Sequence, residues 1–243
     1  PAGRRVEGMC GRFALTDDEA ALMAFLGFSD GVAVVPRYNI APTQPIAIMR
    51  VDNGKRQLTF ARWGLVPAWV ADPGTFSLLI NARSDSVLDK PAFKNAMRYR
   101  RCLVPASGFY EWRRQGRAKQ PFWIRRRDGG PMAFAGLWET LDDRYCGYID
   151  SACSGTVDAN ATVRPIHDRM PAILRQQDEA TWLDPAANDP KALTALLQPY
   201  KGSNLRAYKV SPKVNKPGID DASCIAPLDG EKPPVIGQMG LGL

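Results

Sequence analysis

Four short apolar runs in the middle of the chain constrain its fold more than any other feature. They cover residues 102–105, 109–113, 122–126 and 132–139, and glycine, proline or charged residues separate them. Runs of this length with such breaks are typical of β-strands. We therefore expect a β-rich centre.

A turn signal earlier in the chain predicts a β-hairpin. Asp52-Asn53-Gly54 lies between the strand-like runs 46–51 and 57–63, and an Asn-Gly pair favours the tight turns that join two antiparallel strands. Further strands are expected at residues 78–80, 145–157 and 206–210. The proline-rich segment 36–45 is expected to be an extended loop, because proline breaks helices.

Short helices are predicted around this β-rich centre. Thr16 and Glu19 fit a capping box at a helix start, and Gly27 fits a helix end. Asp189 is a candidate cap for another helix, followed by a proline at the first helical position. The expected helices cover residues 20–26, 91–99, 178–183 and 190–197. With 243 residues and no dividing linker or repeat, the chain is predicted to be one α+β domain.

Composition narrows the function classes. No run reaches the ~18 apolar residues of a membrane helix, and no apolar signal segment is visible near residue 1, so we expect a cytoplasmic protein without a membrane partner. The net charge of +7 suits a polyanionic partner, although it also serves solubility. Five scattered cysteines without a C-x-x-C pair, and the single histidine His167, argue against a disulfide framework or a metal centre. No cofactor is expected.

The pair Met9-Cys10 carries the most specific chemistry. Methionine is removed before small residues, so cysteine can become the first residue of a mature chain. Its free α-amine and thiol can then capture one aldehyde twice, first as an imine and then as a five-membered thiazolidine ring. Taken alone, Cys10 is more often a small buried apolar residue. Glu111 lies in a predicted strand on the face opposite Tyr110 and Trp112, and points either to solvent or into a cleft.

Six sequence motifs, found in one order along the chain, support a functional role for Cys10. The sequence resembles the SRAP family (SOS-response-associated peptidase, the abasic-site processing proteins) from Met9 to about Pro227, through M-C-G-R-F (9–13), Y-N-I-A-P-T (38–43), W-G-L-V-P (63–67), N-A-R-S-D (81–85), G-F-Y-E-W (108–112) and H-D-R-M-P (167–171). The fold expected with it is a mixed, mostly antiparallel, bifurcated or barrel-like β core surrounded by short helices.

The resemblance implies a role for each matching residue. Cys10 would cross-link the ring-opened aldehyde of an abasic site in single-stranded DNA, and Asn81 would position the cysteine and the sugar. Glu111 would transfer protons, and His167 would assist ring opening and reversal. DNA contacts are implied for four further residues: phosphate binding by Arg12 and Arg83, and the DNA path by Pro42 and Trp69. The protein is expected to act as a monomer.

One departure from the family affects this chemistry. Eight residues precede Met9 here, and an amide at Cys10 cannot form a thiazolidine. We expect residues 1–8 to be absent or removed in the active form, with the domain at residues 9–228 and a flexible tail at 229–243. Two alternatives stay open: a cysteine peptidase or hydrolase using Cys10 and His167, and a non-covalent binding module for single-stranded DNA.

Overall fold

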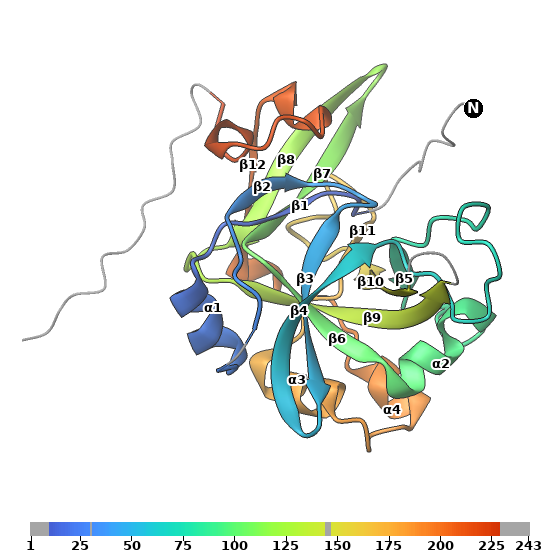
Figure 1. Cartoon of the computed structure of the whole chain (residues 1–243). Helices are drawn as coiled ribbons and strands as arrows, with labels where there is room; N and C mark the ends of the chain where they lie inside the picture. The colour runs from blue at the N-terminus through green and yellow to red at the C-terminus, as the bar shows by residue number, and fades with distance from the viewer. Residues whose placement is uncertain (1–9, 30, 144–146, 229–243) are drawn as a thin grey trace, which may run out of the picture.

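Two β-sheets form the framework of the protein in a computed structural model, which describes residues 10–29, 31–143 and 147–228 (Figure 1). One sheet has five strands in the order β12-β8-β7-β1-β2. The other has seven strands, five of which close into a ring. The five-stranded sheet comprises β1 (Phe13–Leu15), β2 (Arg37–Ile40), β7 (Gly108–Gln115), β8 (Ala118–Arg126) and β12 (Leu205–Lys209).

The ring makes the second sheet barrel-like. Its members are β3 (Pro45–Asp52), β4 (Lys55–Trp63), β6 (Arg101–Ala106), β9 (Met132–Asp143) and β10 (Gly147–Asp158). Their neighbours along the ring are antiparallel except at its closure, where β10 runs parallel to β4. Beyond the ring, β10 continues between β5 (Asn81–Arg83) and β11 (Arg169–Pro171). The sheet therefore forks along β10, and the predicted α+β, mostly antiparallel, barrel-like fold is confirmed.

Short helices cover the ring, as predicted. They are α1 (Glu19–Leu26), α2 (Pro91–Tyr99), α3 (Gln176–Leu183) and α4 (Pro190–Ala195), with 3₁₀ turns η1 (Gly202–Asn204), η2 (Pro212–Asn215) and η3 (Ala222–Cys224). Figure 1 places α2, α3 and α4 at the end of the molecule away from the β7–β8 hairpin tip. No helix in the described ranges is long and apolar enough to cross a membrane.

Most predicted elements are present, with three local corrections. The Asn53-Gly54 hairpin is confirmed, with both residues at positive φ (48° and 75°). The capping prediction was wrong by two residues: Asp18, not Thr16, accepts the hydrogen bond from the Ala21 N–H at 2.8 Å. The strand expected at 78–80 lies at 81–83, because those residues pair with β10. The loop predicted at 36–45 contains β2, and Tyr145 of the predicted strand 145–157 lies outside the described residues.

Aromatic packing holds β1 against the ring of the second sheet. The Phe13 ring lies 5.1 Å from that of Trp63 and 6.0 Å from that of Phe134, both edge-on. These side chains are at most 3% exposed, and such contacts add to the free energy of burial. β1 is therefore anchored to both sheets, and Cys10, three residues upstream, lines a small cavity with the ring residues Trp63 and Ser154.

The close approach of β7 and β8 yields a stability prediction. A Cβ on Gly108 would lie 2.6 Å from the Ile124 carbonyl oxygen and 2.5 Å from Trp123, so Gly108→Ala must push two backbones apart. We expect a loss of about 2 to 3 kcal/mol in the free energy of unfolding, measured by urea denaturation. Gly218→Ala is the matched control, because a Cβ there meets nothing within 4 Å. Equal stability of the two variants would contradict this packing.

Candidate active site

Cys10 lies beside a buried carboxylate. The backbone N–H of Cys10 donates to Glu111 Oε1 at 2.8 Å, across 101 residues of sequence. Glu111 belongs to β7 and is 3% exposed, and Cys10 is 4% exposed. The neighbouring Tyr110 packs on the other face of the strand, with Trp123 and Val214. The alternation predicted for this strand therefore turns Glu111 toward Cys10.

Burial controls the electrostatics of this pair. It raises the pKa of the Glu111 carboxyl, while His167 and the hydrogen bonds from Cys10 oppose that rise. Burial also raises the pKa of the Cys10 thiol well above its usual range; Glu111 adds to that shift, and Arg169 opposes it. The pair therefore favours a neutral thiol beside a carboxyl group that holds its proton more tightly than an exposed glutamate does.

Asn81 reaches Cys10 from a different strand. Its Nδ2 lies 3.5 Å from the Cys10 carbonyl oxygen, at the limit of a hydrogen bond. Its Oδ1 accepts a hydrogen bond at 2.8 Å from the hydroxyl of Ser154 on β10, and Ser154 is 4% exposed. Because β5 pairs in register with β10 at this point, the serine fixes which end of the amide faces the cysteine.

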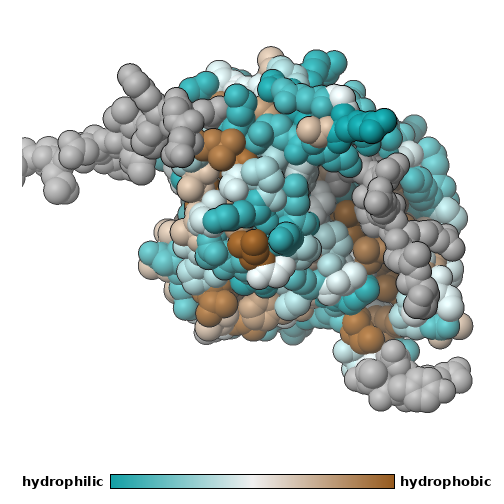
Figure 2. Space-filling view, turned by 90° about the horizontal axis from the view of Figure 1, so that it is seen from above, coloured by the Kyte–Doolittle hydropathy of each residue, from teal (hydrophilic) through white to brown (hydrophobic). Residues whose placement is uncertain are grey.

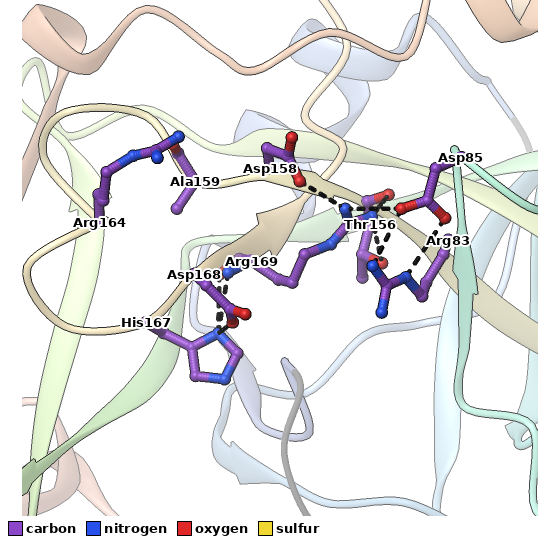
Figure 3. Close-up of polar contacts among 9 residues, drawn as sticks. All are labelled: Arg83, Asp85, Thr156, Asp158, Ala159, Arg164, His167, Asp168 and Arg169. Atoms are coloured by element: carbon purple, nitrogen blue, oxygen red, sulfur yellow. Dashed lines mark hydrogen bonds and ion pairs between the residues drawn. The ribbon is translucent and has the colours of Figure 1, made fainter.

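His167 precedes β11 and shares a cleft of about 380 Å³ with Glu111. Its Nδ1 accepts from the Arg169 backbone N–H at 3.0 Å and lies 3.1 Å from a carboxylate oxygen of Asp168 (Figure 3). The Arg169 carbonyl oxygen also lies 3.2 Å from Nδ1. Contacts from Asp168 and Arg169 therefore hold this side of the imidazole ring.

A buried arginine two residues after His167 joins this segment to β10 and to Asp85. Arg169 has a side chain that is 4% exposed and makes ion pairs with Asp158 at 2.7 Å and with Asp85 at 3.2 Å. It also donates to the Thr156 carbonyl at 2.7 Å. Asp85 in turn binds Arg83, whose side chain is 43% exposed (Figure 3). Arg83 thus lies at the outer, solvent-exposed end of a charged network.

The other predicted DNA contacts differ in position. Pro42 and Arg12 line the cleft, but the Arg12 guanidinium donates to Asn39 Oδ1 and to the Val214 carbonyl, each at 2.6 Å. Trp69 is not among the residues that line the cleft. Its ring is 63% exposed and packs edge-on against Phe76. The cleft therefore gathers Glu111, His167, Arg12 and Pro42, with Cys10 bound to Glu111, and leaves Trp69 apart.

Sequence reasoning missed several cleft residues. Arg114 and Lys119 lie directly opposite each other on the β7–β8 hairpin, and Asn215 accepts a hydrogen bond from Trp112 Nε1 at 2.7 Å. The only available signal was the basic run around this hairpin.

The face seen from above in Figure 2 is mainly hydrophilic, with separate small apolar patches. Within the described ranges, no three His, Cys, Asp or Glu side chains are placed to hold a metal ion.

Comparisons with known proteins agree with this fold. Residues 9–217 match the family described as SOS response associated peptidase (SRAP), and the chain belongs to this family. It is 37% identical over 213 residues to the abasic site processing protein YoqW of Bacillus subtilis, covering 86% of this chain and 95% of that protein. It is 32% identical to the abasic site processing protein HMCES of Xenopus tropicalis, covering 79% and 66%.

Solved structures share the architecture. A crystal structure of a protein from Bacteroides thetaiotaomicron superposes with a TM-score of 0.80 at 25% identity, covering 90% of this chain and all of that one. A second, from Bordetella bronchiseptica, gives a TM-score of 0.73 at 25% identity, covering 83% and 100%. The family membership expected from the six motifs is confirmed.

Proposed function

We propose that this chain processes abasic sites in single-stranded DNA by forming a covalent thiazolidine between Cys10, freed as an amino-terminal residue, and the abasic aldehyde. The observation that carries this proposal is the 2.8 Å hydrogen bond from the Cys10 nitrogen to Glu111. That nitrogen becomes the α-amine when Met9 is absent, so the attacking atom already has a proton acceptor. The names of the relatives support the substrate class.

The residues divide the chemistry into proton-transfer steps. The abasic sugar is mostly a closed hemiacetal, and His167, facing the same cleft as Glu111, opens it by exchanging protons with the ring oxygen and the hydroxyl. Glu111 takes a proton from the α-ammonium, and the free amine attacks the aldehyde carbon. Loss of one water gives an imine. The Cys10 thiol then adds to the imine carbon, its proton passes to the nitrogen, and the ring closes.

The DNA backbone would meet basic groups around this cleft. Arg12, Arg114 and Lys119 line it, and Arg83 is exposed beside the charged network of Arg169. Lysine and arginine bind phosphates and release condensed counterions, while exposed aromatic rings such as Trp69 can stack on unpaired bases. We propose single-stranded DNA as the partner, bound by a monomer in the cytoplasm.

A peptidase that acts on other proteins is less well supported. A nucleophilic cysteine of that kind needs a lowered thiol pKa beside a cation, whereas burial and Glu111 raise the pKa of Cys10. In the reaction with an aldehyde, the nitrogen is therefore the first atom to react and the thiol acts second. A purely non-covalent DNA-binding module leaves the buried Cys10–Glu111 contact without a role.

Self-processing is a second candidate activity, favoured by the position of Glu111 at the Met9-Cys10 peptide nitrogen. The Cys10 thiol would attack the Met9 carbonyl and give its proton to Glu111, the C–N bond would break, and Glu111 would pass that proton to the leaving amine. Water would then hydrolyse the thioester and free the thiol. Incubation of the full chain should release residues 1–9 by intact mass, and an unchanged mass over days would exclude it.

The direct test of the proposed function uses single-stranded DNA with one abasic site and three proteins: the full chain, a version beginning at Met9, and that version with Cys10→Ala. We expect a heat-stable adduct on a denaturing gel from the Met9 version and none from the alanine variant. The full chain should react only as fast as it loses its leader. Absence of an adduct from the Met9 version would overturn the proposal.

Ser154 provides a test of how Asn81 is positioned. Ser154→Ala removes the hydroxyl that holds the Asn81 amide at 2.8 Å, so the amide can turn away from Cys10. We expect adduct formation to slow about tenfold, because small misplacements near reacting atoms have large effects on rate. Affinity for undamaged single-stranded DNA should stay within twofold. A rate equal to that of the parent would remove Ser154 from this positioning role.

A further inference from the structure

A second cavity lies away from the proposed active site, between α1, α3 and the segment 196–204. We call it the α3 cavity; its volume is about 520 Å³, and it shares no lining residue with the cleft that contains Glu111 and His167. Figure 1 places α3 at the opposite end of the molecule from the β7–β8 hairpin tip. A volume of several hundred Å³ is typical of pockets that hold small organic ligands.

A buried carboxylate with an unused oxygen lines this cavity. Glu179, in the first turn of α3, is 1% exposed. Its Oε2 lies 3.7 Å from Arg56 NH1, and its Oε1 has no hydrogen-bond partner. Burial raises the pKa of Glu179 to about 7, with Arg56 opposing the shift. A buried polar atom without a hydrogen-bond partner is unfavourable and is rare in native proteins. A ligand with N–H donors could supply the missing hydrogen bond to this oxygen.

Positive charge surrounds the rest of the cavity. Arg126 and Arg175 line it, each paired with a neighbouring aspartate. Lys201 also lines it and makes no ion pair within the described ranges. These three positive groups would repel a cationic ligand. The Glu179 carboxylate would repel a ligand that places an anion at the buried end of the cavity. The charges therefore favour a ligand with neutral donors at its buried end and an anion at its outer end.

Apolar and aromatic side chains complete the lining. Phe25 and Tyr200 are half-buried aromatic residues, and Leu196 is a half-buried aliphatic one. Such side chains suit a flat ring, which gains both apolar burial and contact with π-faces.

We propose that the α3 cavity binds a guanine nucleotide, with the base at Glu179 and the phosphate toward Lys201. Among the common bases, guanine alone presents two adjacent neutral N–H groups on its pairing edge, which match a carboxylate with two parallel hydrogen bonds. Adenine and cytosine place a ring acceptor beside their amine, and thymine offers one donor. The guanine could come from a free nucleotide or from a nucleic-acid strand, and the experiment distinguishes these sources.

The test is calorimetric titration of the full chain at pH 7.5 with GMP, AMP, guanosine and two short single strands that differ only in a guanine or an adenine. We expect GMP to bind at least tenfold tighter than AMP. Guanosine should bind more weakly than GMP, and Lys201→Ala should remove that difference. Binding only of the guanine strand, with the same dependence on Glu179, would assign the strand as the source.

Glu179→Gln is the decisive variant, because it keeps the size of the side chain and removes the charge. We expect it to weaken GMP binding at least tenfold and to leave cross-linking at Cys10 unchanged. Binding by the parent should tighten from pH 6 to pH 8 as Glu179 ionises among Arg56, Arg126, Arg175, Asp178 and Lys201, whereas the variant should show a flat profile. Equal affinity of parent and variant, or equal binding of GMP and AMP, would overturn the proposal.

Discussion

Replacement of Cys10 by serine in the version that begins at Met9 should abolish the stable adduct while leaving its precursor detectable. Serine is also small enough for methionine removal, so the α-amine and its contact with Glu111 at 2.8 Å are retained. The imine should therefore still form. Even when neutral, a thiol is a far stronger nucleophile than a hydroxyl, so ring closure should slow by at least ~100-fold.

The measurement for this variant combines two conditions on abasic single-stranded DNA. Without reductant, the serine protein should give no heat-stable band. With borohydride present, reduction of the imine should trap an adduct in amounts similar to those from the parent. A heat-stable serine adduct without reductant would show that the sulfur is dispensable, and failure of the borohydride trap would show that the amine does not attack first.

Glu111→Gln should have the second-largest effect, a fall of about 100-fold in the single-turnover rate of adduct formation. Glutamine keeps the size of the side chain and an oxygen acceptor for the Cys10 nitrogen, but it cannot take a proton. Loss of a positioned general base lowers rates by about 10²- to 10⁴-fold. The rate should be followed at pH 7 by quenched gel assays with protein in excess.

The same substitution should not destabilise the protein. The direction of its effect on stability follows from the raised pKa of Glu111. Burial raises the pKa of Glu111 in the folded state, so its favourable contribution is present at low pH and is lost as pH rises through the folded pKa. Glutamine carries no such loss. The melting temperature of Glu111→Gln relative to the parent should therefore increase as pH rises above the ordinary pKa of a glutamate.

Glu139 supplies the matched control. It is also a buried strand glutamate, but it is ion-paired with Arg100, which donates to its Oε2 at 2.9 Å. Glu139→Gln leaves Arg100 without its counter-charge, so it should lower the melting temperature and leave the adduct rate unchanged. A Glu111→Gln variant that loses stability and reacts at the parental rate would contradict the assigned role.

Local sequence signals predicted the secondary structure well where the residues of one segment determine its conformation. Pro91 marks the first turn of α2, whose bounds were predicted correctly, and Asn53-Gly54 supplies the left-handed conformations of the β3–β4 turn. The cap of α1 was misplaced because Thr16 and Asp18 both suit that position. Thr16 instead bonds to Ser107, a contact across 91 residues. Such distant partners leave no local trace.

The site was predicted by motif, and its supporting contacts were not. The resemblance pointed to Cys10, Asn81, Glu111 and His167. Glu111 and His167 line one cleft, Cys10 binds Glu111, and Asn81 contacts Cys10, but their assigned roles stay predictions. No sequence signal marked Ser154, because a serine in a buried strand is common and its partner lies on another strand. Nor could the sequence place Trp69, whose loop packs apart from the cleft. Long-range pairing decides both cases.

The most direct measurement of the central claim is the intact mass and group accessibility of the adduct. Thiazolidine formation joins protein and DNA with the loss of one water and consumes both the α-amine and the thiol of Cys10. The adduct of the Met9 version should therefore weigh the sum of the two components minus water, and a thiol reagent and an amine-terminal reagent should both fail to label Cys10. A full-mass adduct, a thiol that still reacts, or an adduct that retains Met9 would contradict this account.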